Sequence, residues 1–215
     1  MSQVILEVSD DGNFLKYIPK EIGHKGKGRR HLAIAVLLFN SKGQVLLQKR
    51  KHKIFDNIWD ITGATHPLHQ PHLCHSERSE ESQDSNIEIT TSSSTFAQSP
   101  RNDKRCKACK QDNIDETLKE ATLRCLKEEW DIGDIGDIAV LGKFNYFSPY
   151  HTVQGDYCEN EHCFLMVGEY NGEVRLNPQS GYEYKWVDKE EFLKDIKLNP
   201  KNFTPWAIES ARILI

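Results

Sequence analysis

The stretch ETLKEATLRCLKEEWD, residues 116–131, carries an ordered pattern of apolar and charged residues. Apolar residues stand at positions 118, 121, 125 and 126, and charged residues occupy the other face. This spacing is typical of an amphipathic α-helix, because residues three and four apart lie on the same side of a helix. It predicts a helix of about four turns from Asp115 to Trp130.

The charges of this helix are themselves ordered. Glu116, Arg124 and Glu128 are separated by eight and four residues, so they line one face, where Arg124 can bridge both carboxylates. Glu129 lies beside them, and two adjacent carboxylates at the end of a helix can bind Mg²⁺ or Mn²⁺, which prefer oxygen ligands. The same pattern is also typical of a solvated amphipathic helix with ordinary ion pairs.

The residues on either side of this helix predict a sheet. HLAIAVLLF (31–39) and QVLLQKR (44–50) are apolar runs around a turn at 40–43, and together they predict a hairpin. Strands are also expected at 57–62, 138–146, 162–170 and 182–187, and a second helix at 189–196 with Asp188 as its cap. This order of elements predicts an α+β fold in which a mixed sheet is sandwiched by helices.

Residues 69–115 differ in composition from the rest of the chain. They hold only 10 apolar residues among 47, and they include HSERSEESQDS and a Ser/Thr run at 90–95. Such a segment cannot bury enough surface to offset its ordering entropy, so we expect a disordered, low-complexity insertion within a single domain spanning 1–215. A weak candidate for a tetrahedral zinc site lies in it, formed by Cys106, Cys109, His69, His72, Cys74 and His75.

The overall composition narrows the class of protein. The chain has 28 Lys+Arg and 32 Asp+Glu, a net charge of −4 and no long block of like charge, which argues against nucleic-acid binding. No apolar run approaches the roughly 18 residues that span a bilayer, and the N-terminus lacks an export signal. We therefore expect a cytoplasmic protein without a membrane segment, whose six cysteines are thiols or ligands. The composition does not predict the oligomeric state.

A second group of potential metal ligands is scattered along the chain. His24 and His31 lie seven residues apart, His66 follows the expected third strand in TGATHP, and Glu159 and Glu161 alternate in CENEHCF. The spacing of the two glutamates places both carboxylates on one face of a strand. Three imidazoles and two carboxylates suit one Mn²⁺, Zn²⁺ or Fe²⁺ ion, although each residue taken singly also fits an ordinary loop or sheet position.

The helix motif resembles the Nudix box, G-x5-E-x7-R-E-U-x-E-E-x-G-U. Glu116, seven further residues and then RCLKEE (124–129) match its centre, with Gly63 as a candidate first glycine beyond the insertion. Cys125 replaces the first Glu of the R-E pair, and Asp131 replaces the closing Gly. In Nudix hydrolases the replaced Glu is one of three carboxylates that hold the catalytic metals, and a thiol is a poor ligand for a hard cation.

The wider set of residues, from about Lys20 to Trp206, resembles type 1 isopentenyl-diphosphate isomerases. The resemblance implies one metal ion held by three histidines and two glutamates, and a Mg²⁺ on the substrate diphosphate held with the help of Glu129. It further implies cationic contacts to the diphosphate, a tyrosine beside the catalytic Glu161 and a tryptophan facing the branched carbon. The implied metal ligands are His24, His31, His66, Glu159 and Glu161, the cations are Lys20, Arg50 and Lys53, and the aromatic residues are Tyr146 and Trp206.

The isomerase reaction requires a proton delivered to one face of the substrate and another removed from the opposite side, through a tertiary carbocation. Glu161 with Tyr146 could exchange protons on one side, and the ring of Trp206 could stabilise the cation by about 2 kcal/mol. In that family a Cys stands two residues before the His of the HP turn, whereas this chain has Ala64, which cannot transfer a proton.

Three hypotheses follow from these residues. The first is an isopentenyl-diphosphate isomerase of isoprenoid biosynthesis with an altered proton relay. The second is a Nudix hydrolase that cleaves a nucleoside or prenyl diphosphate with a metal-activated water. The third is a module that binds a metal or a prenyl diphosphate without turnover. All three predict a small-molecule diphosphate or metal ligand.

Overall fold

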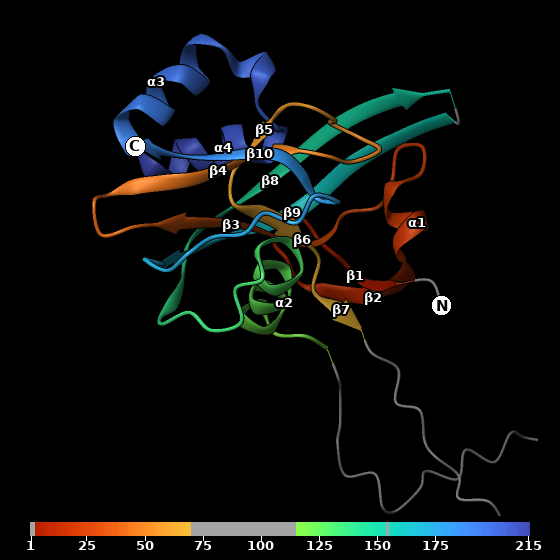
Figure 1. The fold of residues 1–215 in the computed structure, drawn as a ribbon. Coiled ribbons are helices and arrows are strands. Elements are labelled where there is room, and N and C mark those ends of the chain that lie inside the picture. Colours follow the sequence, from red (N-terminus) through yellow and green to blue (C-terminus); the bar gives the residue numbers. More distant parts are fainter. Residues whose placement is uncertain (1–2, 70–114, 154) are drawn as a thin grey trace, which may run out of the picture. The chain divides into compact units, whose positions relative to one another are not determined.

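The apolar run 31–39 forms the centre of a mixed ten-stranded sheet in a computed structural model of the chain (Figure 1). The structure describes residues 3–69, 115–153 and 155–215. Its strands are β1 (Val4–Val8), β2 (Phe14–Pro19), β3 (His31–Phe39), β4 (Gln44–Arg50), β5 (Trp59–Asp60), β6 (Gly63–Thr65), β7 (Leu68–His69), β8 (Ile138–Thr152), β9 (Gly155–Glu169) and β10 (Gly181–Asp188).

Helices cover both faces of this sheet (Figure 1). α2 (Leu118–Trp130) lies on one face, while α3 (Lys189–Leu198) and α4 (Pro205–Leu214) lie on the other. A short helix, α1 (Lys20–His24), follows β2, and a 3₁₀ turn, Pro200–Asn202, joins α3 to α4. The predicted α+β class, a mixed sheet between helices, is confirmed.

Alternation along β3 builds the two cores. Ala33, Ala35 and Leu37 pack with α3 and α4, whereas Ile34 and Val36 face α2. A strand buried on both faces reads as a continuous apolar run, which is why 31–39 has no polar residue between its ends. β3 pairs in parallel with β9 and antiparallel with β6, so the end of β6 and the part of β9 around Glu161 both lie at the start of β3.

The predicted hairpin of β3 and β4 is confirmed, and so are strands at 138–146, 162–170 and 182–187, although β8 and β9 extend further. The expected strand at 57–62 is a strand only at Trp59–Asp60. The helix at 189–196 continues to Leu198, and Asp188 occupies the predicted N-cap position. Its side chain makes no capping hydrogen bond, however, and accepts from Gln44 instead (3.3 Å).

The start of α2 was predicted three residues too early. Thr117 is its N-cap and forms a capping box with Glu120, so Glu116 precedes the helix. The T-x-x-E signature that marks this start stands in the sequence. Sequence reasoning also did not predict β1, β2, α1 or α4.

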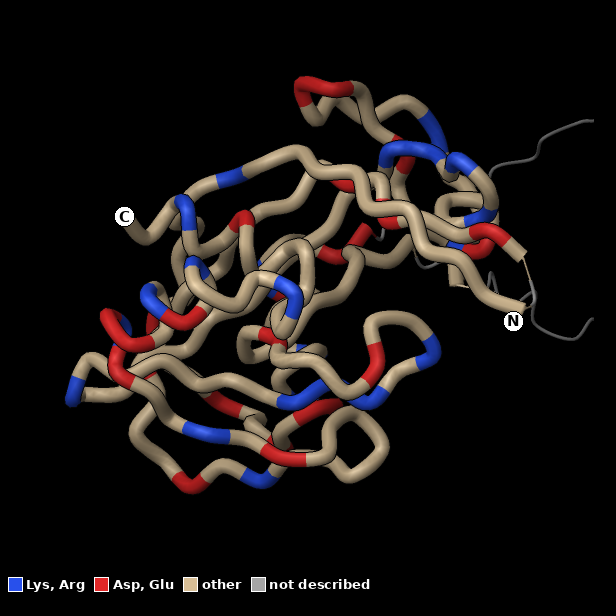
Figure 2. Tube along the Cα trace, turned by 90° about the horizontal axis from the view of Figure 1, so that it is seen from above, with Lys and Arg blue, Asp and Glu red and all other residues tan. Residues whose placement is uncertain are grey.

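The expected insertion at 69–115 lies, apart from its two end residues, outside the described part of the chain, and so does most of the candidate zinc cluster. The end residues themselves are paired: His69 Nδ1 lies 2.7 Å from Asp115 Oδ1. In the part that the structure describes, no helix is long and apolar enough to cross a membrane. Basic and acidic residues are interspersed along the trace (Figure 2).

Candidate functional site

The register of the central strands brings the predicted metal ligands together. β3 and β9 run parallel, and His31 pairs with Glu161 at the start of their ladder. Glu159 lies on the same face of β9, because side chains alternate along a strand. His66 follows β6, which pairs with β3, and His24 ends α1. The order of the strands therefore assembles residues that are far apart in the chain.

These five side chains form one cluster. Each offers one ligand atom, and the five atoms lie within 4.8 Å of one another. His66 Nε2 lies 3.0 Å from Glu161 Oε1 and 3.1 Å from His31 Nε2, while His24 Nε2 lies 3.2 Å from Glu159 Oε2. All except His24 are buried. Imidazoles and carboxylates thus face one another away from bulk water.

Backbone carbonyls orient two of the imidazoles. Nδ1 of His24 lies 2.7 Å from the carbonyl oxygen of Lys20, and Nδ1 of His31 lies 2.7 Å from that of Arg29. A proton on Nδ1 that is donated to the carbonyl leaves the Nε2 lone pair directed into the cluster, as in metal-bound histidines. Among the described residues, buried Glu159 Oε2 accepts no hydrogen bond. This donor set fits one divalent ion such as Mn²⁺ or Zn²⁺.

Burial and mutual contacts set the charge of the cluster. Burial lowers the pKa of His66 well below 6.5, which keeps its imidazole neutral. Burial disfavours the ionised form of Glu161, yet the neighbouring His31 and His66 hold its pKa well below 4.5. Burial and the neighbouring Glu161 raise the pKa of Glu159. A cation would relieve this repulsion between two buried carboxylates.

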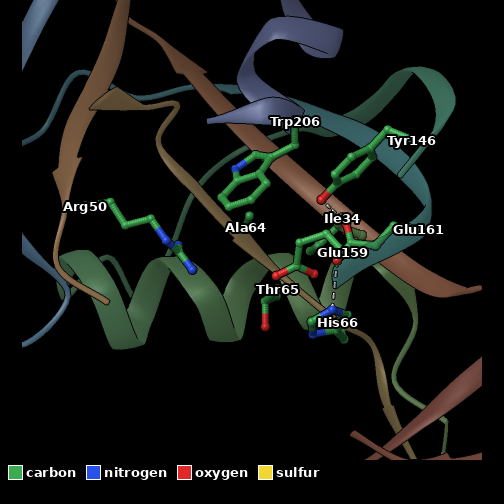
Figure 3. Close-up of a pocket in the computed structure, with 9 residues that line it drawn as sticks. All are labelled: Ile34, Arg50, Ala64, Thr65, His66, Tyr146, Glu159, Glu161 and Trp206. Carbon is green, nitrogen blue, oxygen red and sulfur yellow. Dashed lines mark hydrogen bonds and ion pairs between the residues drawn. The ribbon is translucent and has the colours of Figure 1, made fainter. Parts of the chain in front are cut away.

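A pocket adjoins the cluster (Figure 3). The Tyr146 hydroxyl donates a 2.6 Å hydrogen bond to Glu161 Oε2. In the view of Figure 3, the Trp206 ring lies next to Ala64, with Arg50 on one side and the glutamates on the other. The pocket is lined by Ile34, Arg50, Ala64, Thr65, His66, Tyr146, Glu159, Glu161 and Trp206.

The three predicted diphosphate contacts differ in position. Burial lowers the pKa of Lys20, while the negative charge of Glu159 opposes this shift, so the ammonium lies near the cluster. Arg50 lines the pocket, and its guanidinium carbon lies 5.0 Å from the centre of the Trp206 ring. Lys53 is exposed and does not line the pocket. Of the three cations, Arg50 alone lines this pocket.

Arg124 of α2 connects the helix to the cluster. It donates to the two oxygens of Glu116 at 2.8 and 2.9 Å and to the carbonyl oxygen of His66 at 2.9 Å. Its contact with Glu128 is longer, 3.5 Å, and the Glu128 side chain is 62% exposed. Arg124 thus contacts both carboxylates, as predicted, but its short contacts are those to Glu116 and to the backbone of His66. Glu128 lies outside the five-residue cluster.

Glu129 points inward from the same helix. It accepts a 2.6 Å hydrogen bond from Gln48, and the Cys125 thiol lies 3.6 Å from its other oxygen. Burial raises the pKa of Glu129 to about 7. A Cβ on Gly63 would come within 2.8 Å of the Cys125 sulfur, so any larger residue here would have to displace the Cys125 side chain. Glu129 also lies outside the five-residue cluster, and its predicted role with Mg²⁺ stays a prediction.

Residues 113–207 match the family model of the NUDIX domain. The chain contains a Nudix domain. It is similar to the isopentenyl-diphosphate Delta-isomerase of Serratia proteamaculans, with 23% identity over 208 residues, 96% of this chain and 88% of that protein. It is also similar to that of Gibberella zeae, with 25% identity over 96% of this chain and 71% of that protein. In fold it is similar to DR0079 from Deinococcus radiodurans, with a TM-score of 0.59, 15% identity and 97% of each chain covered.

The structure accounts for the two departures from the Nudix box. Asp131 ends α2 in the left-handed conformation, with φ of 56°, a position that favours glycine but that Asp tolerates. Burial raises the pKa of Cys125 well above 9, so the Nudix domain has a neutral thiol where a third carboxylate is usual. Asp131 therefore keeps the backbone conformation that the glycine of the motif would adopt, whereas Cys125 removes a potential metal-binding carboxylate.

Sequence reasoning missed one buried carboxylate beside this pocket. Asp60 accepts hydrogen bonds from Trp206 Nε1 at 2.6 Å and from Thr204 Oγ1 at 2.9 Å. Asp60 is a charged residue, yet it is fully buried, and in the sequence NIWDIT it stands between the apolar residues Trp59 and Ile61. A lone charged residue between apolar strand residues is the signal that could have found it, because a buried charge requires partners.

Proposed function

We propose that this chain is a metal-dependent enzyme of the isopentenyl-diphosphate isomerase type, which moves a double bond in a small prenyl diphosphate. The observation that supports this function best is the meeting of three features at one pocket. They are the five-residue cluster, the short hydrogen bond between Tyr146 and Glu161, and the indole of Trp206. The isomerase-named relatives, which match over most of the chain, agree with it.

The five-residue cluster would hold one Mn²⁺ or Zn²⁺ ion, whose positive charge keeps the adjacent carboxylates ionised and fixed. Glu161 would remove a proton from the substrate, or return one, at an oxygen that Tyr146 holds in place. Trp206 would present its ring to the positive charge that develops at the tertiary carbon. Trp206 and Tyr146, which would face this charge, are themselves buried.

The diphosphate would lie toward Lys20 and Arg50, the two cations near the pocket. Glu129, together with a Mg²⁺ ion, would bind the same group, since a buried carboxylate of raised pKa favours an approaching cation. The substrate's hydrocarbon part would then extend toward Trp206 and the metal cluster.

Ala64 is the difficulty for this reaction. It lines the pocket at the position of the cysteine acid in the similar isomerases, and it carries no exchangeable proton. Neighbouring Thr65 also lines the pocket, but a hydroxyl of ordinary pKa is a weak acid. The proposed enzyme therefore takes its second proton from another donor, such as a water molecule in the pocket.

The test is incubation with isopentenyl diphosphate in D₂O, with Mg²⁺ and Mn²⁺, for the native chain, for Ala64→Cys and for Glu161→Gln. Mass spectrometry follows deuterium and the dimethylallyl product. Product from the native chain that is lost in Glu161→Gln supports the proposal. Product from Ala64→Cys alone means that the scaffold fits the isomerase substrate but that the native reaction differs. No product from either chain contradicts the proposal.

A second candidate is a Nudix hydrolase of a nucleoside or prenyl diphosphate. Ala64 and the buried Glu129 of the Nudix helix favour it, because hydrolysis needs a metal-activated water and no proton donor at position 64. Release of phosphate or monophosphate from a panel of diphosphates should then be lost in Glu129→Gln and retained in Glu191→Gln, which changes an exposed carboxylate on α3, outside the Nudix helix. Tight binding of a diphosphate without turnover would instead favour the non-catalytic module.

A further inference from the structure

The buried carboxylate of Asp60 contacts two pocket residues that the proposed reaction uses. Its Oδ1 accepts the Trp206 indole N–H at 2.6 Å and the Thr204 hydroxyl at 2.9 Å. Its Oδ2 lies 3.5 Å from Nη1 of Arg50. Asp60 is 0% exposed and Trp206 is 3% exposed, so water does not screen these contacts.

We propose that Asp60 is a positioning residue, which holds the Trp206 indole and the Arg50 guanidinium in a fixed relation at one wall of the pocket. This inference rests on the proposed function, which assigns Trp206 to the hydrocarbon part of the substrate and Arg50 to its diphosphate. A short prenyl diphosphate must meet both groups at once. Their relative placement therefore decides whether the reacting carbon lies at the indole when the diphosphate is bound.

The fold explains how one carboxylate reaches both residues. Asp60 pairs with Gln48 across β5 and β4, and Arg50 lies two residues further along β4. Thr204 is the N-cap of α4, and Trp206 is the second residue of that helix. Asp60 thus joins the sheet to the start of α4. Without this acceptor the buried indole N–H would have no hydrogen-bond partner. Because an unsatisfied buried donor costs free energy, the ring would then tend to rotate away from this position.

The contact also changes the indole electronically. A carboxylate that accepts the indole N–H raises the electron density of the ring, and negative charge near the ring increases its attraction for a cation. Burial raises the pKa of Asp60 to about 6, while Arg50 and the hydrogen bonds oppose the shift. The carboxylate is therefore ionised at pH 8, where the following experiment is made.

The test compares the native chain with Asp60→Asn and Thr204→Val by NMR of protein labelled with ¹⁵N in its four tryptophans. Trp206→Phe assigns the signal. A charge-assisted hydrogen bond shifts an indole N–H downfield, so the Trp206 signal should move upfield in Asp60→Asn and stay downfield in Thr204→Val, which keeps the carboxylate. An unchanged Trp206 signal in a folded Asp60→Asn protein overturns the proposal.

The kinetic arm uses the native chain or Ala64→Cys, whichever turns over isopentenyl diphosphate. Asp60→Asn should lower kcat about tenfold to a hundredfold per folded molecule, the size typical for loss of one charged hydrogen bond to a catalytic group. Unchanged kcat overturns the positioning role, because a purely structural residue alters only the folded fraction. If neither chain turns over, the proposed function fails, and the NMR comparison still decides whether Asp60 orients Trp206.

Discussion

Glu159→Gln should have opposite effects on stability with and without a divalent metal. The ligand oxygens of Glu159 and Glu161 lie within 4.8 Å of each other, and both side chains are less than a tenth exposed. At an effective dielectric constant near 20, two like charges at this separation repel by about 3 kcal/mol. In chelator at pH 8.5 we expect Glu159→Gln to raise the free energy of unfolding by about 1–3 kcal/mol, the lower value if His24 keeps part of its charge.

The sign follows from the raised pKa of Glu159. A carboxyl whose pKa is higher in the fold than in the unfolded chain destabilises the fold once the pH rises through that range, so the advantage of Glu159→Gln should shrink at pH 5. With Mn²⁺ at about a thousand times its Kd, the native chain should gain about 4 kcal/mol, and the variant, which lacks one anionic ligand, should gain less.

Urea unfolding with chelator and with Mn²⁺ measures both differences. Glu128→Gln is the matched control, because the same change on an exposed side chain outside the cluster should alter neither stability nor the gain from metal. A native chain more stable than Glu159→Gln in chelator, or an equal gain from Mn²⁺ in both proteins, would refute the reasoning that these carboxylates form a metal site.

Three further predictions address the elements around this site. Tyr146→Phe leaves one oxygen of Glu161 without its 2.6 Å donor, and deuterium exchange into isopentenyl diphosphate should fall about tenfold to a hundredfold while circular dichroism stays native. Arg124→Leu removes the donor to the His66 carbonyl, and titration with Mn²⁺ should show affinity weakened about tenfold. Replacement of 70–114 by a short Gly/Ser linker should leave the melting temperature and the metal content unchanged, because His69 and Asp115, which flank the replaced residues, already contact each other. A protein that fails to fold would show that 70–114 is needed for the fold.

The parts of the fold that local pattern controls could be predicted from the sequence. The β3–β4 hairpin follows from two apolar runs and a short polar turn, and α2 from its helical spacing. The pairing of Glu159 and Glu161 on one face follows from strand alternation. The meeting of these glutamates with three histidines does not, because it depends on the parallel register of β3 and β9, which no local pattern predicts. Only the resemblance to a known family implied that these five residues share one metal ion.

The parts that tertiary contacts decide were missed or misplaced. Glu128 and Glu129 are neighbours in sequence, yet one is exposed and the other points to Gln48, since one residue turns a helix by about 100°. No local pattern tells which of them faces the sheet. The partners of Asp60, Thr204 and Trp206, are 144 and 146 residues away, so only the assembled fold shows that this charge is satisfied.

The two departures at positions 64 and 125 constrain function in opposite directions. A neutral, buried Cys125 weakens the carboxylate set that hydrolases place on this helix, whereas Ala64 removes the acid that isomerases place beside the HP turn. The short contacts of Arg124 run to Glu116 and the His66 loop, so in this chain the Nudix helix supports the five-residue cluster more directly than it builds a metal site of its own. The carboxylate set on the Nudix helix lacks one of its three members, whereas the five-residue cluster that the isomerase reaction would use has all of its ligands together. This asymmetry, together with the intact cluster, is why the isomerase-type function ranks ahead of hydrolysis.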